Sequence, residues 1–462
     1  MANKEATEVK QVGRYFGTDG FRGKAGDDLT AEHAFKIGCF LGWYFGQSGE
    51  KAKIVIGKDT RISSYMFESA LASGVASAGG DVFLLHVTTS PCVGYIARTE
   101  DFDCGIMISA SHNPYYDNGI KLLNNEGEKM SDDVIGQIED YLDGDFEVPY
   151  ATNDDIGRIN DYYFGRNKYI GYLTNLAVMS FENCKAGIDC ANGSAWMMGR
   201  AVFDALGAKT YVINNDPSGT NVNMGCGSTH IEGLQDFVRT RHLDVGFAFD
   251  GDADRCIAVD EHGDVVNGDK IMYVCAKYLK DKGQFPTNTV VATVMSNMGL
   301  FKALDKLGIN YETTKVGDRY VYENMKANGY KLGGEQSGHI IFRDHAHTGD
   351  GIITAIMVMN AMLETQLPLS ILAKNFKEYP QILTNVEVDD KDATMNDEYV
   401  IKAVADMEKA LGDTGRVLLR KSGTEPVLRV MSEALEEADA KNAVETIIDA
   451  MRRNNHLKKV RR

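Results

Sequence analysis

Apolar positions in the first part of the chain recur at two spacings, which predict alternating helices and strands. Helical spacing joins Ala34, Ile37, Leu41 and Tyr44 after Thr30, and joins Phe67, Leu71 and Val75 after Ser63 and Ser64. We expect one of these two serines to cap the second helix. Short apolar runs predict strands at residues 53–57, 81–87 and 104–108. This alternation indicates a parallel sheet covered by helices.

The same alternation returns twice before the pattern changes. Further strands are predicted at residues 186–193, 208–215, 245–249, 289–294 and 309–316, and helices at 162–173, 298–307 and from Ile352. Residues 416–429 then read as strand, turn and strand, and a last helix buries Val444, Ile447, Ile448 and Met451 before a solvated basic tail. We predict three tandem α/β domains (mixed sheets flanked by helices) at 1–153, 154–258 and 259–371, followed by an α+β domain at 372–462.

Charge and cysteine usage exclude several function classes. The 462 residues carry a net charge of −17, which argues against binding nucleic acid or an anionic membrane. The longest apolar stretch, residues 352–363, is shorter than the roughly 20 residues that span a membrane, and the first residues lack the apolar core of a signal peptide. None of the eight cysteines forms a Cys-x-x-Cys pair. We therefore expect buried free thiols in a reducing cytoplasm.

A serine and a histidine follow the apolar run 106–108. Pro114 cannot continue a strand, so Ser111 and His112 are expected on a loop at its carboxyl end. Ligands of open α/β sheets bind at that edge. Ser111, with His112 beside it and Lys121 nearby, is a candidate carrier of a phosphoryl or acyl group. The same residues also suit a turn whose polar side chains bind backbone groups.

Three aspartates follow the predicted strand 245–249. Asp250, Asp252 and Asp254 occupy alternate positions, so in extended backbone their carboxylates point the same way and can bind one Mg²⁺. An EF-hand would need glycine where Arg255 stands. A phosphatase with an aspartate nucleophile would leave Ser111 without a role. We therefore predict a magnesium site.

Two glycine-rich segments offer groups that could bind a ligand. Arg22 lies between Phe21 and Gly23 in a turn-rich stretch, where backbone amides and a guanidinium can approach a ligand, although an ordinary hairpin would read the same way. Glu335 and Ser337 lie on a glycine-flanked loop and suit sugar hydroxyls. His339 beyond them is a candidate proton carrier or a core histidine.

The C-terminal domain carries a basic turn. Arg420, Ser422, Gly423, Thr424 and Arg429 offer guanidinium, hydroxyl and amide donors around it. Such donors form a phosphate cradle even in an acidic protein, and we favour this interpretation over a basic turn between strands without a ligand.

These motifs together closely resemble the α-D-phosphohexomutase superfamily. The resemblance runs from residues 17–23 (GTDGFRG) to 420–426 (RKSGTEP). Residues 109–114 resemble its phosphoserine loop, 250–255 its metal loop and 334–339 its sugar-specificity loop. Gln336 and residues 226–230 favour the branch that acts on glucosamine phosphates. Phe21 and Ala253 depart from the usual residues without removing a ligand.

The resemblance implies four domains around a central cleft and interconversion of glucosamine 6-phosphate and glucosamine 1-phosphate through a bisphosphate. It implies phosphoserine at Ser111, with Mg²⁺ held by Ser111, Asp250, Asp252 and Asp254. Proton relay and charge stabilisation are expected from Lys121, Arg22, His339 and His112. Substrate binding is expected from Glu335, Ser337, Arg255, Arg420, Ser422, Gly423, Thr424 and Arg429.

Two alternatives remain open. One is a phosphoglucomutase/phosphomannomutase of broad specificity, and the other is a catalytically silent regulator that binds sugar phosphates. A binding module has no need of Ser111, which argues against the second. We expect a monomer or a homodimer.

Overall fold

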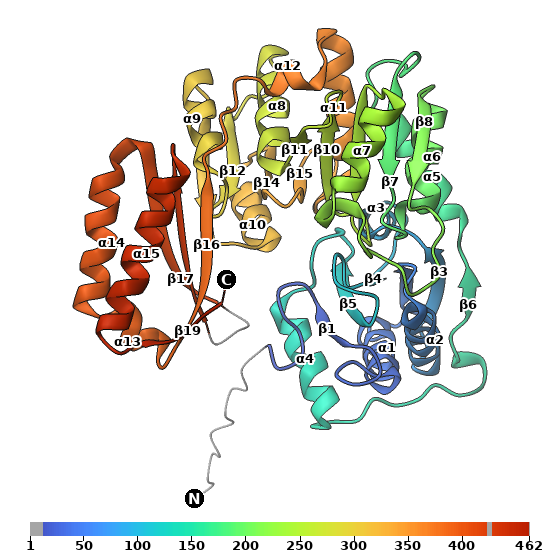
Figure 1. Ribbon diagram of the computed structural model, residues 1–462. Helices are drawn as coiled ribbons and strands as arrows, with labels where there is room; N and C mark the ends of the chain where they lie inside the picture. The colour runs from blue at the N-terminus through green and yellow to red at the C-terminus, as the bar shows by residue number, and fades with distance from the viewer. Residues whose placement is uncertain (1–12, 423–426, 462) are drawn as a thin grey trace, which may run out of the picture. The chain divides into compact units, whose positions relative to one another are not determined.

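The computed structural model describes residues 13–422 and 427–461 (Figure 1). The chain divides into two compact units, Met1–Val294 with Asn310–Ala373 and Met295–Ile309 with Lys374–Arg462. The first unit holds three mixed sheets and the second an antiparallel sheet. The predicted fold class, tandem α/β domains followed by a different C-terminal domain, is confirmed.

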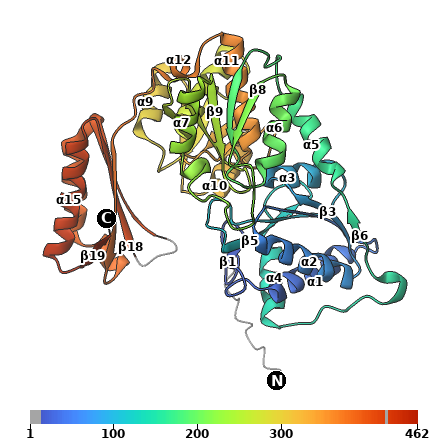
Figure 2. The same cartoon turned by 45° about the vertical axis from the view of Figure 1, so that its right-hand side comes forward.

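The first sheet has the strand order β1-β5-β4-β2-β3-β6. Its strands are β1 (Phe21–Lys24), β2 (Lys53–Lys58), β3 (Asp81–Val87), β4 (Cys104–Ile108), β5 (Asp117–Asn124) and β6 (Ile159–Asp161). Its helices are α1 (Ala31–Gly46), α2 (Ile62–Ser77), α3 (Ser90–Thr99) and α4 (Asp132–Asp143), with a short 3₁₀ turn at Asn153–Asp155. Helices α1, α2 and α4 cover one face and α3 the other (Figure 2).

Three neighbouring strands of this sheet end at the same edge, and α2 begins close to it. Strands β4, β2 and β3 are parallel, whereas β5 runs antiparallel to β4. The prediction that Ser63 or Ser64 caps α2 is wrong. The helix begins at Ile62 without a side-chain cap, and the Ser64 hydroxyl instead donates to Asp59 Oδ1 at 2.7 Å.

The second sheet has the order β11-β10-β9-β7-β8. Its elements are α5 (Phe164–Thr174), β7 (Lys185–Asp189), α6 (Ala195–Ala205), β8 (Lys209–Ile213), a 3₁₀ turn (Gly227–Thr229), α7 (Glu232–Arg241), β9 (Val245–Phe249), β10 (Cys256–Asp260) and β11 (Val265–Val266). The division proposed between residues 258 and 259 passes through β10, which pairs with both β9 and β11. A boundary after Val266 keeps this ladder whole, and we propose it instead.

The third sheet has the order β13-β12-β14-β15. Its elements are α8 (Gly268–Asp281), β12 (Thr289–Thr293), β13 (Asn310–Thr314), α10 (Asp318–Asn328), β14 (Leu332–Gly334), β15 (Ile340–Phe342), α11 (Gly351–Thr365) and α12 (Leu369–Ala373). Helix α11 is the apolar stretch that the sequence predicts as a buried helix. Asp350 caps it by accepting from the amides of Ile352 and Ile353 at 3.0 and 2.9 Å.

The second unit is built on the antiparallel order β17-β18-β16-β19. Its elements are α9 (Met298–Leu307), β16 (Gln381–Val388), α13 (Lys391–Met395), α14 (Glu398–Leu411), a 3₁₀ turn (Gly412–Thr414), β17 (Gly415–Lys421), β18 (Val427–Ala434), α15 (Glu437–Arg453) and β19 (Leu457–Arg461). The basic tail is not simply solvated as predicted, because it forms β19 and pairs with β16. Alternation of side chains lets Val460 pack on the core while its neighbours Lys459 and Arg461 face water.

Two further observations concern the cysteines and the helices. All eight cysteines are free and buried. Within residues 13–422 and 427–461, no helix has the length and apolar character needed to cross a membrane.

Candidate active site

Ser111 lies on the loop that follows β4, at the carboxyl edge of the first sheet. Its side chain is 1% exposed, and its hydroxyl donates to Asp250 Oδ2 at 2.5 Å. His112 Nδ1 lies 3.3 Å from the same hydroxyl. The backbone of Ser111 is left-handed, with φ of 51°, which costs a residue other than glycine roughly 1–2 kcal/mol. A buried hydroxyl held in this conformation is positioned at the expense of stability.

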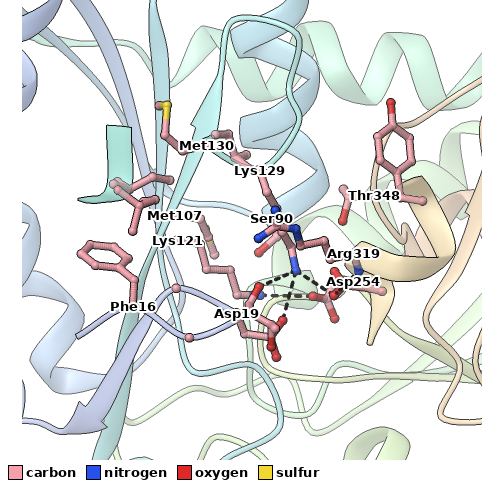
Figure 3. A pocket seen from close by; sticks show the side chains of 18 of the residues that line it. Phe16, Asp19, Ser90, Met107, Lys121, Lys129, Met130, Asp254, Arg319 and Thr348 are labelled. Carbon is pink, nitrogen blue, oxygen red and sulfur yellow. Dashed lines mark hydrogen bonds and ion pairs between the residues drawn. The ribbon is translucent and has the colours of Figure 1, made fainter. Parts of the chain in front are cut away.

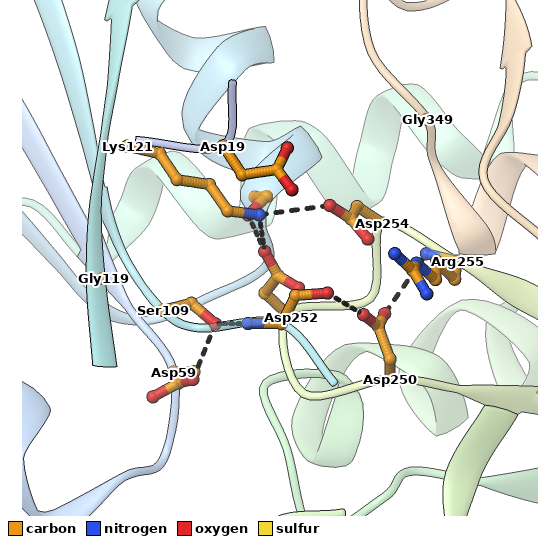
Figure 4. Close-up of polar contacts among 12 residues, drawn as sticks. Asp19, Asp59, Ser109, Gly119, Lys121, Asp250, Asp252, Asp254, Arg255 and Gly349 are labelled. Carbon is orange, nitrogen blue, oxygen red and sulfur yellow. Dashed lines mark hydrogen bonds and ion pairs between the residues drawn. The ribbon is translucent and has the colours of Figure 1, made fainter. Parts of the chain in front are cut away.

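The three aspartates predicted as metal ligands converge on the loop between β9 and β10 (Figure 4). Asp250, Asp252 and Asp254 are buried, and a carboxylate oxygen of each lies within 4.8 Å of the others. Oδ1 of Asp252 is buried without a hydrogen-bond partner among the described residues. Carboxylate oxygens at this spacing, one of which is not used in a hydrogen bond with the described residues, fit a hard divalent cation such as Mg²⁺.

The charge balance of this cluster is uneven. Burial, together with the carboxylates of Asp254 and Asp252, raises the pKa of Asp250 to about 8. Burial acts in the same direction on Asp254, but the Lys121 ammonium and His339 outweigh it and hold the pKa of Asp254 well below its usual range. Of these two carboxyl groups, Asp250 therefore has the greater need of a positive partner.

Lys121, on β5, supplies part of the positive charge. Its Nζ lies 2.5 Å from Asp252 Oδ2 and 3.2 Å from Asp254 Oδ2. Burial opposes the charged form, yet the two carboxylates outweigh it and raise the pKa of Lys121 above its ordinary value. The lysine therefore carries its proton here and suits the role of proton donor better than that of base.

His339 lies between the metal loop and the turn before α11. Its Nδ1 is 3.7 Å from Asp254 Oδ1, and its Nε2 accepts from the amide of Gly349 at 2.9 Å. Burial lowers the pKa of His339, but Asp254, Asp318 and Glu335 outweigh it and raise the value to about 9. The contact with the Gly349 amide opposes this rise in the pKa, because an N–H cannot donate to a protonated nitrogen. The geometry places the ring proton on Nδ1, toward Asp254.

His112 is in the opposite situation. Burial, followed by the positive charges of Arg255 and Arg22, lowers the pKa of His112 to about 4. The imidazole is therefore neutral near pH 7 and can accept a proton. Arg22, on β1, lies 3.4 Å from Asp19 Oδ2, and the Nε atoms of Arg22 and Arg255 are buried without hydrogen-bond partners in the part of the chain that the structure describes. Buried donors of this kind suit an anionic ligand.

The predicted sugar loop joins β14 to β15. Oε1 of Glu335 accepts from the amide of Gly317 at 3.0 Å, and the carbonyl of Gln336 accepts from the amide of Gly268 at 3.0 Å. The Ser337 hydroxyl is buried and, within the described ranges, has no hydrogen-bond partner. The loop thus leaves Ser337 available to a ligand while its backbone is fixed.

The predicted phosphate cradle lies in the second unit. Arg420 is the partner of Arg429 across the β17–β18 ladder, and the Nε atom of each is buried with no hydrogen-bond partner in residues 13–422 or 427–461. Burial, followed by the charge of Arg429, lowers the pKa of Arg420. Directly after β17, the Ser422 amide donates to the Val427 carbonyl at 3.0 Å. Gly423 and Thr424 lie outside the described residues.

A cavity of about 430 Å³ borders Lys121 and Asp254 (Figure 3). Apolar side chains line one side and polar ones the other, among them Phe16, Met107, Met130, Arg319 and Thr348. Lys129 Nζ lies 3.2 Å from Asp19 Oδ1 and 2.7 Å from Asp318 Oδ1 at its wall. A small molecule in this space would reach Lys121 and Asp254 directly.

Sequence reasoning assigned no role to several residues around Ser111. The Ser90 hydroxyl, at the start of α3, donates to Asp252 Oδ2. Asp59 and Arg61 are fully buried beside the serine loop and form an ion pair at 2.8 Å. A signal was present, because the polar run 58–61 ends β2, the strand beside β4, and carboxyl ends of parallel strands meet at one edge.

Comparison with known proteins assigns a family to this arrangement. Four consecutive regions match phosphoglucomutase/phosphomannomutase domains: domain I at residues 13–148, domain II at 167–263, domain III at 267–379 and the C-terminal domain at 383–450. The chain is 60% identical over 444 residues to a phosphoglucosamine mutase of Lachnospira eligens, covering 96% of this chain and 99% of that protein. It is 46% identical over 442 residues to the phosphoglucosamine mutase of Bacillus subtilis, with coverage of 96% and 99%.

Solved structures share the fold at low sequence identity. A phosphoglucomutase/phosphomannomutase family protein of Burkholderia thailandensis superposes with a TM-score of 0.81 at 23% identity, covering 96% of this chain and 98% of that one. N-acetylphosphoglucosamine mutase of Aspergillus fumigatus, solved with GlcNAc-6P and magnesium, gives a TM-score of 0.68 at 16% identity, with 96% of each chain covered.

Proposed function

This chain belongs to the α-D-phosphohexomutase superfamily, and we propose that it interconverts glucosamine 6-phosphate and glucosamine 1-phosphate. Relatives named phosphoglucosamine mutase at 46–60% identity over nearly the whole chain support this function. The structural observation that carries it is the Ser111 hydroxyl, buried against Asp250 in a cluster of three carboxylates. It is an isomerase that works by phosphoryl transfer.

The reaction uses two transfers through Ser111. In the first, O1 of glucosamine 6-phosphate attacks phosphorus on phosphorylated Ser111, so that the bond from phosphorus to Oγ breaks, the bond to O1 forms and the O1 proton is taken up by His112 and returned to Oγ. In the second, Oγ attacks the 6-phosphoryl group of the bisphosphate, the bond from phosphorus to O6 breaks, the serine proton passes to O6 and glucosamine 1-phosphate is released. The protein supplies positioning and charge stabilisation for both.

We assign the proton and charge roles from the charge states around Ser111. Neutral His112, 3.3 Å from Oγ, accepts and returns the serine proton. Lys121 is protonated and donates to, or neutralises, the oxygen that leaves phosphorus. Arg22 offers an unpartnered buried Nε–H to the transferring group, and His339 orients Asp254.

The cofactor that we propose is Mg²⁺. Ser111, Asp250, Asp252 and Asp254 would hold it, and the unpartnered Oδ1 of Asp252 is the atom that most favours a cation here. When bound, the ion neutralises negative charge on the phosphoryl group. The carboxylates of this chain keep that position aligned with the serine hydroxyl.

Substrate recognition is proposed to use two loops. Glu335 and Ser337 bind sugar hydroxyls, and Arg255 binds phosphate beside them. Arg420, Ser422 and Arg429, with Gly423 and Thr424, bind the phosphate that is not being transferred. We propose four domains, with boundaries after residues 153, 266 and 371, and a phosphate-binding loop in the last domain that can bind either phosphate of the bisphosphate.

The test compares substrates directly. Purified protein with Mg²⁺ and a trace of glucose 1,6-bisphosphate is given glucosamine 6-phosphate, glucose 6-phosphate or mannose 6-phosphate, and the sugar phosphates are followed by phosphorus NMR. Fastest conversion of glucosamine 6-phosphate is expected. Faster conversion of glucose or mannose phosphate would instead indicate a phosphoglucomutase/phosphomannomutase. Absence of conversion with Ser111 phosphorylated would indicate a binding protein.

The cellular setting that we propose is supported by the thiols and by the proposed substrate. Eight buried free cysteines suit a reducing compartment, and we propose the cytoplasm, where sugar phosphates are made. A monomer or a homodimer is proposed, and light scattering of the purified protein decides between them.

A further inference from the structure

The backbone of Ser111 is hydrogen-bonded on both sides of its Cα atom. The Ser111 amide donates to Ser109 Oγ at 2.9 Å. The Ser109 hydroxyl donates to Asp59 Oδ2 at 2.7 Å (Figure 4). The Ser111 carbonyl accepts from Arg61 Nη2 at 2.9 Å and from Asn223 Nδ2 at 2.8 Å. Fixing both peptide groups fixes φ and ψ, and so the direction of the Cα–Cβ bond.

The side-chain N–H groups of Arg61 donate either to carbonyls of this loop or to Asp59, its partner in an ion pair. A guanidinium has five N–H groups, and this one is fully buried. Its Nε donates to Asp59 Oδ2 at 2.8 Å. Its other donors bind carbonyls of the serine loop, namely Ser111, Asn113, Pro114 and Asp117. One planar group thus defines the course of the chain from Ser111 to Asp117.

Asn223 reaches the same carbonyls from the second sheet's side. Its Nδ2 donates to the carbonyls of Ser111 and Asn113 at 2.8 and 3.2 Å, and its own amide donates to the carbonyl of Ala191 at 2.9 Å. The metal loop lies against this contact, since a Cβ at Gly251 would lie 2.5 Å from the Ser111 oxygen. The serine loop and the metal loop are therefore locked together.

We propose that Arg61 and Asn223 are positioning residues, which hold the Ser111 carbonyl from two sides and so keep the Ser111 hydroxyl on Asp250. The proposal rests on the phosphoryl transfer proposed above and deepens it. Left-handed backbone is unfavourable for serine, so without these donors the peptide relaxes and Oγ turns away from the aspartates. Misplacing a reacting atom by about 1 Å can reduce rate 100-fold.

The decisive variant is Asn223→Asp, which keeps the shape of the side chain but replaces the donor with an acceptor. We expect kcat for glucosamine 6-phosphate to fall about 10- to 100-fold with KM changed less than about twofold. Arg61→Lys should behave alike, because an ammonium cannot reproduce the planar fork. The matched control is Asn360→Asp, a buried asparagine that donates to the Leu176 carbonyl at 2.9 Å. It should lower Tm while leaving kcat unchanged.

Two further measurements separate this inference from the proposed function. The rate at which glucose 1,6-bisphosphate phosphorylates Ser111, followed by intact mass, should fall in Asn223→Asp but not in Asn360→Asp. A crystal structure of Asn223→Asp should show φ of Ser111 away from 51°. Unchanged φ, or an unchanged kcat and phosphorylation rate, overturns the inference. A wild-type protein inactive on every hexose phosphate contradicts the proposed function, and the crystal structure then decides the positioning role alone.

Discussion

Arg420 and Arg429 are opposite each other on neighbouring antiparallel strands, with both Nε atoms buried. Like charges in this register destabilise a sheet, and burial also lowers the pKa of Arg420. Within the described residues neither Nε atom has a hydrogen-bond partner. An arrangement that costs stability and leaves donors unused is typical of a site for an anion, here the phosphate of the substrate.

Replacing Arg429 with alanine should therefore weaken binding rather than chemistry. A hydrogen bond between charged groups contributes about 1.5–3 kcal/mol, so we expect KM for glucosamine 6-phosphate to rise roughly 10- to 100-fold with kcat changed less. Steady-state kinetics measure both. The control is Arg452→Ala, which removes an exposed arginine paired with Asp449. An equal KM in both variants would show that the substrate phosphate binds elsewhere.

Removing the Ser111 hydroxyl should abolish turnover. Ser111→Ala has no oxygen to carry phosphorus, so kcat should fall at least about 1000-fold, and incubation with glucose 1,6-bisphosphate should add no phosphoryl group by intact mass. Ser77→Ala on α2, whose hydroxyl only donates to the Ser73 carbonyl, should keep full activity. A phosphorylated, active Ser111→Ala protein would refute the mechanism.

Magnesium should stabilise the folded protein as well as activate it. A cation bound only by the native state at 100 times its Kd adds about 2.7 kcal/mol, so Tm should rise with Mg²⁺ and fall again with EDTA. Asp252→Asn should lose most of this gain. Asp236→Asn, an exposed aspartate on α7, should keep it. Equal gains in both variants would place the ion elsewhere.

Asp350 should make stability depend on pH. Burial is the main cause that raises its pKa to about 6, above the unfolded value of about 3.9. Between these values the folded state keeps a proton that the unfolded state has lost, so stability falls as pH rises from about 4 to about 6 and then levels off.

The change in Asp350 should be worth at most about 3 kcal/mol, from two pKa units at 1.36 kcal/mol each. Urea unfolding of wild type and Asp350→Asn across this pH range measures the difference, since asparagine can cap α11 but does not titrate. A difference that stays constant with pH would show that the pKa of Asp350 is the same in the folded and unfolded states.

Much of the fold and the metal loop could be predicted because their signals are local. Helical and strand periods and the apolar stretch of α11 each occupy a few adjacent residues. Asp250, Asp252 and Asp254 converge as predicted from their closeness in the chain, but the backbone between them is a turn with φ of 57° at Ala253, and not the extended chain that the alternate spacing suggested. Local reading failed where tertiary pairing dominates: the basic tail pairs with β16 as β19, and the Ser64 hydroxyl binds Asp59 instead of capping α2.

Patterns of residues close together in the chain indicated the alternation of strands and helices, the serine on a strand-end loop and the three aspartates. The charge states of Lys121 and His112 depend instead on the folded structure, because carboxylates and arginines approach these residues from other strands. The folded structure also shows that Arg61, 50 residues before Ser111, holds that residue's carbonyl. Every residue has a backbone carbonyl. An arginine that binds carbonyls therefore needs no particular residue type as its partner, and no sequence pattern reveals the contact.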